Sequence, residues 1–158
     1  MNLAAQILER AKRHQVMIAS AESCTGGMIA AAMTDIAGSS AVFERGFVTY
    51  TNAAKRDMLD VKESTLNAHG AVSEEVAREM VQGALAHSNA QIAVSVTGIA
   101  GPGGSDFKPE GRVCFGLQHA DHIMSETIEF GALGRENVRK AARDHALSLI
   151  LDRLSHFA

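Results

Sequence analysis

Aromatic residues, cysteines and long apolar runs are all scarce in this sequence of 158 residues. It has no Trp and a single Tyr, so the core must be built from Ala, Val, Ile, Leu and Met. Two cysteines, Cys24 and Cys114, are too few for a disulfide framework. No stretch approaches the roughly 18 uninterrupted apolar residues that a membrane-spanning helix needs. These absences exclude a disulfide-stapled secreted domain and an integral membrane protein, and we expect a soluble protein of the cytoplasm.

Positive charge is also sparse, because the formal net charge is −3 and no run of Lys or Arg exceeds two residues. Proteins that bind the phosphate backbone need a clustered basic surface. Residues 1–13 have the pattern of an amphipathic, charged helix and not that of an apolar signal segment. We therefore expect neither a nucleic-acid partner nor a membrane partner.

What the chain does contain is ordinary for a globular protein, with 46% apolar and 21% charged residues. Its length is that of one domain with a continuous core. No repeat, linker or change of composition divides it, so a single domain spanning residues 1–158 is the economical interpretation.

Patterns of helix and strand alternate along the chain. Helical spacing of apolar residues predicts helices over 3–11, 28–36, 52–59, 74–85 and from about 135 onward. Short apolar or alternating runs predict strands over 16–22, 46–50, 92–96, 113–117 and 123–130. Some strands are joined by a hairpin and others by a helical crossover. This order predicts a three-layer α/β/α sandwich with a mixed sheet of about five strands.

Two loops, 23–27 and 97–104, are richer in glycine than a simple connection requires, and each follows a predicted strand. In open α/β sheets, ligands bind beyond the carboxyl ends of the strands. The free N–H groups at a helix start can hold a phosphate or stabilise an oxyanion, and glycine allows close approach. Ser23 is also a common type of helix cap, so capping and catalysis both remain open for it.

Neither loop matches a well-known phosphate or hydrolase motif. The segment 23–27 lacks the Gly-x4-Gly-Lys-Ser/Thr pattern of a P-loop and the Gly-x-Ser-x-Gly pattern of the nucleophile elbow. It is not a dinucleotide-binding fingerprint either. Small phosphorylated molecules and acyl chemistry therefore remain as candidate ligands and reactions.

A serine nucleophile needs a base, and Lys55 is a candidate because it falls about one turn into the helix that follows Tyr50. Burial disfavours the ammonium form, so a desolvated lysine can accept the proton of a serine hydroxyl. An exposed Lys55 is the alternative. Cys24 is the rival nucleophile, since a thiol at a helix N-terminus has a lowered pKa. Cys114 lies within a predicted strand and is expected in the core.

Arg135 and Arg139 lie one helical turn apart at the start of the last predicted helix, so they project on the same side. Such a pair suits a phosphate or a carboxylate, and a pair of surface charges is the alternative. The seven histidines are scattered, without cysteine or carboxylate at ligand spacing. We expect no metal site and no redox cofactor.

Five segments in order, 21–27, 35–40, 46–55, 69–73 and 97–102, together resemble the CinA C-terminal domain family, and the resemblance covers nearly the whole chain. Members are similar to nicotinamide-nucleotide amidases, which convert nicotinamide mononucleotide to nicotinate mononucleotide and ammonia. The resemblance implies Ser23 as the nucleophile, Lys55 as its general base and Tyr50 as an assisting or orienting group. It is also compatible with a homo-oligomer.

The two loops and the resemblance together define an expected set of substrate-binding residues: Cys24, Thr25, Gly26, Gly27, Thr97, Gly98, Gly101, Arg135 and Arg139. Two other hypotheses remain. One is a non-catalytic nucleotide- or phosphate-binding module, in which both loops serve recognition only. The other is a competence-related interaction protein that acts through its surface in DNA uptake or repair.

Overall fold

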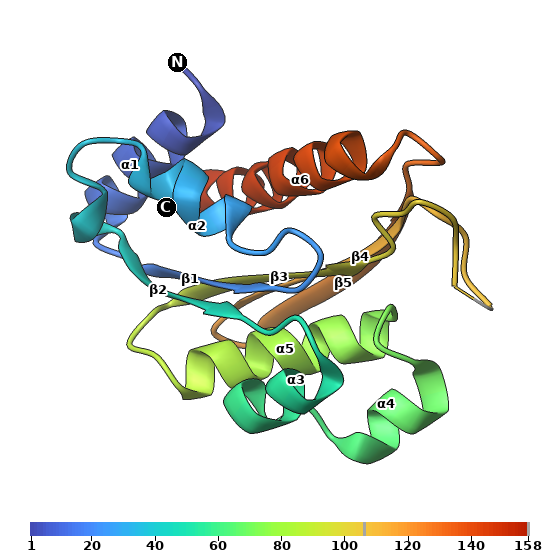
Figure 1. Ribbon diagram of the computed structural model, residues 1–158. Coiled ribbons are helices and arrows are strands. Elements are labelled where there is room, and N and C mark those ends of the chain that lie inside the picture. The colour runs from blue at the N-terminus through green and yellow to red at the C-terminus, as the bar shows by residue number, and fades with distance from the viewer. Residues whose placement is uncertain (106, 158) are drawn as a thin grey trace.

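A computed structural model describes residues 1–105 and 107–157 and contains a five-stranded sheet with helices on both faces (Figure 1). The strands are β1 (Ile18–Glu22), β2 (Phe43–Val48), β3 (Ile92–Gly98), β4 (Arg112–His119) and β5 (His122–Glu129). Their order in the sheet is β2-β1-β3-β4-β5. β1 pairs in parallel with β2 and β3, whereas β4 pairs antiparallel with β3 and β5. The predicted mixed sheet is confirmed.

Helices cover both faces of the sheet (Figure 1). One face carries α1 (Leu3–His14), α2 (Met28–Thr34) and α6 (Arg135–Ser155). The other carries α3 (Asn52–Leu59), α4 (Glu63–His69) and α5 (Glu74–Ala86). A short 3-10 helix, Ser39–Ala41, leads into β2. Within the described residues, no helix combines the length and the hydropathy that crossing a membrane requires.

β3 lies at the centre of the sheet, and its alternate side chains enter two different cores. Val94 and Val96 pack with residues of α1, α2 and α6, whereas Ala93 packs with residues of α5. Small residues on the α5 face allow that helix to approach closely. A Cβ at Gly116 in β4 would lie 2.6 Å from the carbonyl oxygen of Ala77, so only glycine fits there.

The bounds of β2 and α2 differ from those predicted, and the helix α4 was not predicted. β2 ends at Val48, which pairs with Glu22, so Tyr50 lies beyond the strand and not within it. α2 ends at Thr34 and not at residue 36. α4 has no side-chain cap at its own N-cap residue, Lys62, so the usual sequence signal for a helix start is absent there.

The parallel strands determine where a site can form. Because β2, β1 and β3 run in the same direction, the segments that follow Val48, Glu22 and Gly98 leave the same edge of the sheet. The α3 helix then begins at Asn52, where Thr51 Oγ1 accepts a hydrogen bond from the Ala54 N–H at 3.1 Å. This cap directs the first turns of α3, and with them Lys55, back toward β1.

Candidate active site

The segments that follow the three parallel strands line one cleft with a volume of about 350 Å³. The segment after β1 contributes Ser23 and Cys24, and the segment after β2 contributes Tyr50, Asn52 and Lys55. The remaining lining residues come from the loop after β3, the α4–α5 connection and the start of α6: 97–105, Ala71, Val72 and Arg135. Of the residues expected at the site, Ser23, Cys24, Tyr50, Lys55, Thr97, Gly98, Gly101 and Arg135 therefore lie together.

Ser23 and Lys55 are in direct contact at the floor of this cleft. Lys55 Nζ donates to Ser23 Oγ at 3.0 Å and to the carbonyl oxygen of Tyr50 at 3.3 Å. The Lys55 side chain is only 1% exposed. Among the residues that the structure describes, no carboxylate forms an ion pair with it.

This environment favours the neutral amine. Burial lowers the pKa of Lys55 below its ordinary value, and the nearby Cys24 opposes this shift only partly. A neutral lysine within hydrogen-bonding distance of a serine hydroxyl is the arrangement that activates serine as a nucleophile.

Cys24 is a poor nucleophile in this structure, contrary to the lowered pKa expected at a helix N-terminus. Its side chain is buried, and burial raises the pKa of the thiol to about 11. Its own backbone N–H and Arg139 act in the opposite direction but do not outweigh desolvation. The thiolate that attack requires is therefore disfavoured.

Tyr50 contributes to the site through two different groups. Its carbonyl oxygen accepts from Lys55 Nζ and lies 3.4 Å from Ser23 Oγ. Its phenol group is turned away from that pair, because the hydroxyl accepts from Arg135 NH2 at 2.7 Å and the side chain is 55% exposed. The main chain of Tyr50 thus lies against the dyad, while its hydroxyl orients Arg135.

The glycine amides of the turn after Ser23 donate to groups of the protein itself, so they are not the free N–H groups expected for a ligand. The Gly26 N–H donates to the Ser23 carbonyl at 3.0 Å, and the Gly27 N–H donates to Glu22 Oε1 at 3.2 Å. Both glycines have left-handed φ angles, +56° and +105°. Thr25 is fully buried. Within the described chain, the amide of Cys24, a residue of the cleft lining, donates to no backbone carbonyl, whereas Thr25 lies outside that lining.

Glu22 is a residue of this site that sequence reasoning did not single out. It ends β1, a strand whose five residues are all buried, and its side chain is 1% exposed. The signal was present in the sequence, since an acidic residue directly before a Gly-rich turn rarely lies in a core strand without a partner. The identity of that partner was not visible without the fold.

The loop after β3 is held in place at both of its ends. Thr97 Oγ1 donates to the Ala71 carbonyl at 2.9 Å, which ties the end of β3 to the α4–α5 connection. Glu110 accepts from the Gly103 N–H at 2.6 Å and from the Gly134 N–H at 3.3 Å, which ties the loop to the start of α6. Glu110 was not expected at the site.

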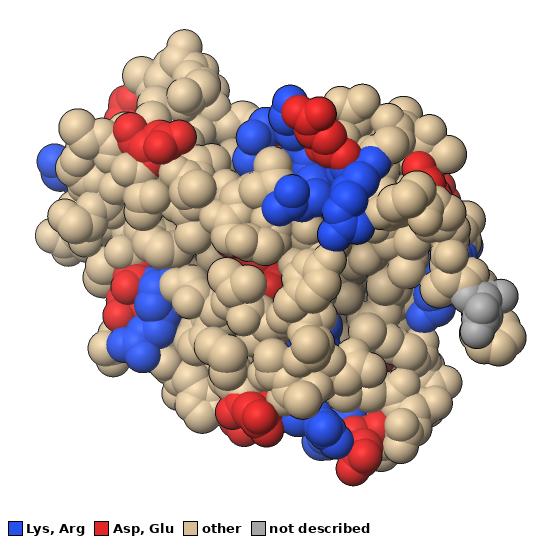
Figure 2. Space-filling view, viewed as in Figure 1, with Lys and Arg blue, Asp and Glu red and all other residues tan. Residues whose placement is uncertain are grey.

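The two arginines expected to bind a phosphate have different environments. Figure 2 shows Lys and Arg side chains gathered over α6, where Lys140 pairs with Glu136 and Arg143 pairs with Asp144. Arg135 is exposed at the cleft and donates to the Gly101 carbonyl at 2.7 Å. Arg139 is not a residue of the cleft lining. It donates instead to the carbonyls of Cys24 and Thr25. Arg135 alone is therefore placed to meet a ligand in the cleft.

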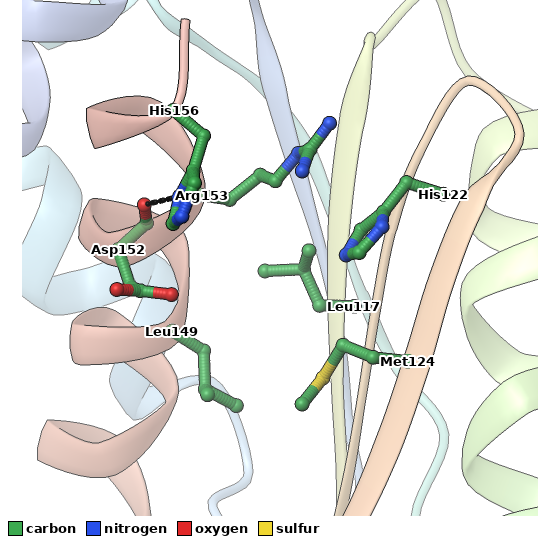
Figure 3. Close-up of a pocket in the computed structure, with 7 residues that line it drawn as sticks. All are labelled: Leu117, His122, Met124, Leu149, Asp152, Arg153 and His156. Carbon is green, nitrogen blue, oxygen red and sulfur yellow. Dashed lines mark hydrogen bonds between the residues drawn. The ribbon is translucent and has the colours of Figure 1, made fainter.

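A second hollow lies between the C-terminal end of α6 and the β4–β5 hairpin (Figure 3). Its floor is apolar, with Leu117, Met124 and Leu149 pointing toward one another. The lining residue His122 pairs with His119 at the end of β4, and His119 pairs in turn with Ile92, the first residue of β3. This hollow therefore lies near the opposite end of β3 from Ser23 and Lys55, and its lining contains no Ser, Cys or Lys.

Comparisons with known proteins agree with this fold. Residues 1–154 match the family model described as the CinA C-terminal domain. The chain is 48% identical over 151 residues to the nicotinamide-nucleotide amidohydrolase PncC of Escherichia coli K12, covering 95% of this chain and 92% of that protein. It is 54% identical over 136 residues to the protein of the same name from Enterobacter agglomerans, covering 85% and 82%.

A solved structure agrees as well. The competence/damage inducible protein CihA of Agrobacterium tumefaciens superposes with a TM-score of 0.93 at 48% identity, covering 98% of this chain and 94% of that one. The family match spans all of the segments that line the cleft. The chain belongs to the CinA C-terminal domain family.

Proposed function

We propose that this protein is an amidohydrolase that converts nicotinamide mononucleotide to nicotinate mononucleotide and ammonia, with Ser23 as nucleophile and Lys55 as general base. The observation that carries the chemistry is the 3.0 Å contact between Ser23 Oγ and a buried lysine without a carboxylate partner in the described chain. The names of the PncC relatives support the choice of substrate.

The reaction begins with neutral Lys55, because only the free amine can accept the Ser23 proton. As the proton moves to Lys55 Nζ, Ser23 Oγ attacks the amide carbon and the C=O π electrons move onto oxygen. The amide of Cys24, which lines the cleft and donates to no backbone carbonyl in the described residues, then donates to this oxyanion.

Collapse of the tetrahedral intermediate breaks the C–N bond. Lys55 returns its proton to the leaving nitrogen, which departs as ammonia and leaves an ester on Ser23. A water molecule gives a proton to neutral Lys55 and attacks the ester carbon. The second collapse returns that proton to Ser23 Oγ and releases the carboxylic acid.

Arg135 is placed to bind the phosphate of the mononucleotide. It lies at the opening of the cleft, and in the described residues it donates only to uncharged oxygen atoms, the Gly101 carbonyl and the Tyr50 hydroxyl. A phosphate is a stronger acceptor for a guanidinium than either of these groups. The protein acts on a soluble small molecule of the cytoplasm and needs no nucleic-acid, membrane or metal partner for this reaction.

The test measures ammonia release from nicotinamide mononucleotide, from the riboside without phosphate and from free nicotinamide. We expect the highest kcat/KM for the mononucleotide. Arg135→Ala should raise its KM by about 10- to 100-fold, the loss expected for hydrogen bonds to a charged group, and leave the riboside unaffected. Lys140→Ala is the matched control, because Lys140 pairs with Glu136 outside the cleft lining.

Saturable binding of the mononucleotide without ammonia release would instead support the non-catalytic binding module. Equal turnover of the mononucleotide and the riboside would show that the phosphate is not recognised. The oligomeric state, for which a homo-oligomer is our hypothesis, can be measured in the same preparations by light scattering.

A further inference from the structure

Glu22 carries a carboxylate that is buried beside the candidate nucleophile without an ion-pair partner in the described part of the chain. Removing a charge from water costs several kcal/mol unless hydrogen bonds replace the lost solvation. In this protein five donors do so, and they are of two kinds. Two are hydroxyls and three are backbone amides, namely Thr25 Oγ1 at 2.6 Å, Ser20 Oγ at 3.4 Å, and the N–H groups of Gly27, Ile29 and Ala30 at 3.2, 2.9 and 3.0 Å.

These amides belong to the first turn of α2, so Glu22 acts as the cap of that helix. The residue at the N-cap position is Gly27, which has no side chain to perform this role. The carboxylate reaches the helix from the end of β1, five residues earlier in the chain, and its charge complements the positive end of the helix dipole. The helix N-terminus is therefore already occupied by an anion and is not available to the phosphate of a ligand.

The cap also determines the shape of the turn between β1 and α2. The turn is attached to β3 by the Ser23 N–H, which donates to the Val96 carbonyl at 2.9 Å. At its other end it is attached to Glu22 through Thr25 Oγ1 and the Gly27 N–H. The amide of Cys24, which donates to no backbone carbonyl in the described residues, lies between these attachments.

We propose that Glu22 is a positioning residue that holds the Cys24 amide in place as an oxyanion donor for attack by Ser23. The proposal rests on the proposed function and adds to it the residue that keeps this donor aligned. Glu22 itself does not touch the substrate. It acts by accepting from the Thr25 hydroxyl and the Gly27 amide, which fixes the peptide planes between Ser23 and Gly27.

The decisive variant is Glu22→Gln, which keeps the shape but replaces one acceptor oxygen with an NH2 group. That group faces N–H donors, so at least one of the cap bonds is lost. We expect kcat to fall by about 10²-fold, the usual cost of a misaligned oxyanion donor, with KM changed by less than about threefold. KM is spared because Arg135 and the loop after β3, which we propose to bind the substrate, do not touch Glu22.

Glu79→Gln is the matched control. Glu79 is also a carboxylate that caps a helix from outside it, since it accepts from the Lys62 N–H at 2.8 Å and from the Thr65 hydroxyl at the start of α4. It lies outside the residues that line the cleft. Both variants should lower Tm, but only Glu22→Gln should lower kcat when each is assayed well below its Tm.

A milder pair of variants separates alignment from folding. Thr25→Val removes one donor to Glu22 and keeps the carboxylate, and we expect kcat to fall roughly tenfold, as for one lost hydrogen bond to a charged group. Thr25→Ser restores the hydroxyl and should restore most of kcat. Equal kcat for Glu22→Gln and wild type, or equal losses for Glu22→Gln and Glu79→Gln, would overturn the proposal.

Failure of the proposed function is distinguished by a probe that needs no amide. A phosphonyl fluoride forms a bond from Ser23 Oγ to phosphorus and expels fluoride while Lys55 takes the proton, and mass spectrometry locates the label. If the wild type is labelled at Ser23 but releases no ammonia, the substrate is wrong. Slower labelling of Glu22→Gln than of Glu79→Gln still supports the positioning role, and equal rates contradict it.

Discussion

The parallel and antiparallel halves of the sheet each place a serine beside charged or basic side chains, but the residues around the two serines differ. At the end of β1, Ser23 lies against a buried lysine. In β5, Ser125 donates to Glu74 at 2.9 Å and accepts from Arg78 at 3.1 Å, so its neighbours are a carboxylate and a guanidinium, and it lies outside the cleft lining. A serine becomes a nucleophile through its neighbours, and within residues 1–105 and 107–157 it is the parallel half that brings a buried amine to a serine.

Strand direction explains the difference. The carboxyl ends of β1 and β2 lie at one edge, and each continues into a helix, so a helical residue such as Lys55 can return to the neighbouring strand. β4 instead connects to β5 through Ala120 and Asp121 alone, which leaves no room for a helix start. The predictions below set matched residues of the two halves against each other.

The largest expected effect separates the two serines. Ser23→Ala should lower kcat by at least about 10³-fold, because the covalent route is lost. Ser125→Ala should change kcat by less than about twofold, since it lies outside the cleft lining. Ammonia release at saturating substrate measures both. Comparable losses in the two variants would remove the functional distinction between the halves.

Lys55→Met should have the next largest effect and should act in opposite directions on activity and stability. Loss of the general base is expected to lower kcat by about 10²- to 10⁴-fold. Because burial lowers the pKa of Lys55, the unfolded state binds more protons in the window between the lowered pKa and the ordinary value of 10.5. The wild type therefore gains stability as pH rises through that window and lacks this stability below it.

Methionine carries no charge to bury, so Lys55→Met should raise Tm by at least about 2–4 °C at neutral pH, as for 1 kcal/mol in a chain of this size. Calorimetry at neutral and alkaline pH checks this, and the gain over wild type should shrink as pH rises. Lys140→Met, at an exposed position, provides the control. A lower Tm for Lys55→Met at neutral pH would mean that the lysine stabilises the fold.

The smallest effect is expected from the two cysteines. Burial raises the thiol pKa of both Cys24 and Cys114, so neither is poised as a thiolate. Cys24→Ala and Cys114→Ala should each cost about 1 kcal/mol of stability, a typical value for a buried substitution, and change kcat by less than about fivefold. Denaturant unfolding and ammonia release measure the two quantities. Loss of activity in Cys24→Ala alone would make Cys24 the nucleophile.

The sequence was sufficient for those parts of the fold that depend on local chemistry. Ser73, of a residue type that commonly caps helices, directly precedes the predicted helix 74–85, and its hydroxyl accepts from the Val76 N–H at 3.2 Å. The hairpin and the last helix were predictable from alternation and helical spacing. α4 was missed because its cap, Glu79, comes from another helix, and such a contact depends on the fold rather than on local sequence.

The site was predictable as a set of positions but not as a set of contacts. Lys55 lies in a helix with ordinary polar neighbours, and only the parallel pairing of β1 and β2 turns it toward Ser23. The two arginines have the same spacing and charge in the sequence, yet Arg135 faces the cleft and Arg139 binds the carbonyls of the turn. For Glu22 it was the partners that the sequence did not reveal, because they lie five to eight residues away at the start of the helix that it caps.

The solitary tyrosine provides a spectroscopic reporter of the cleft. The sequence contains no Trp and only Tyr50, so its near-ultraviolet emission arises from a single phenol at the opening of the candidate site. That phenol accepts a hydrogen bond from Arg135, the residue that we propose to bind the phosphate. A ligand that draws Arg135 away should change the emission of one known fluorophore, so binding can be titrated in the unlabelled wild-type protein.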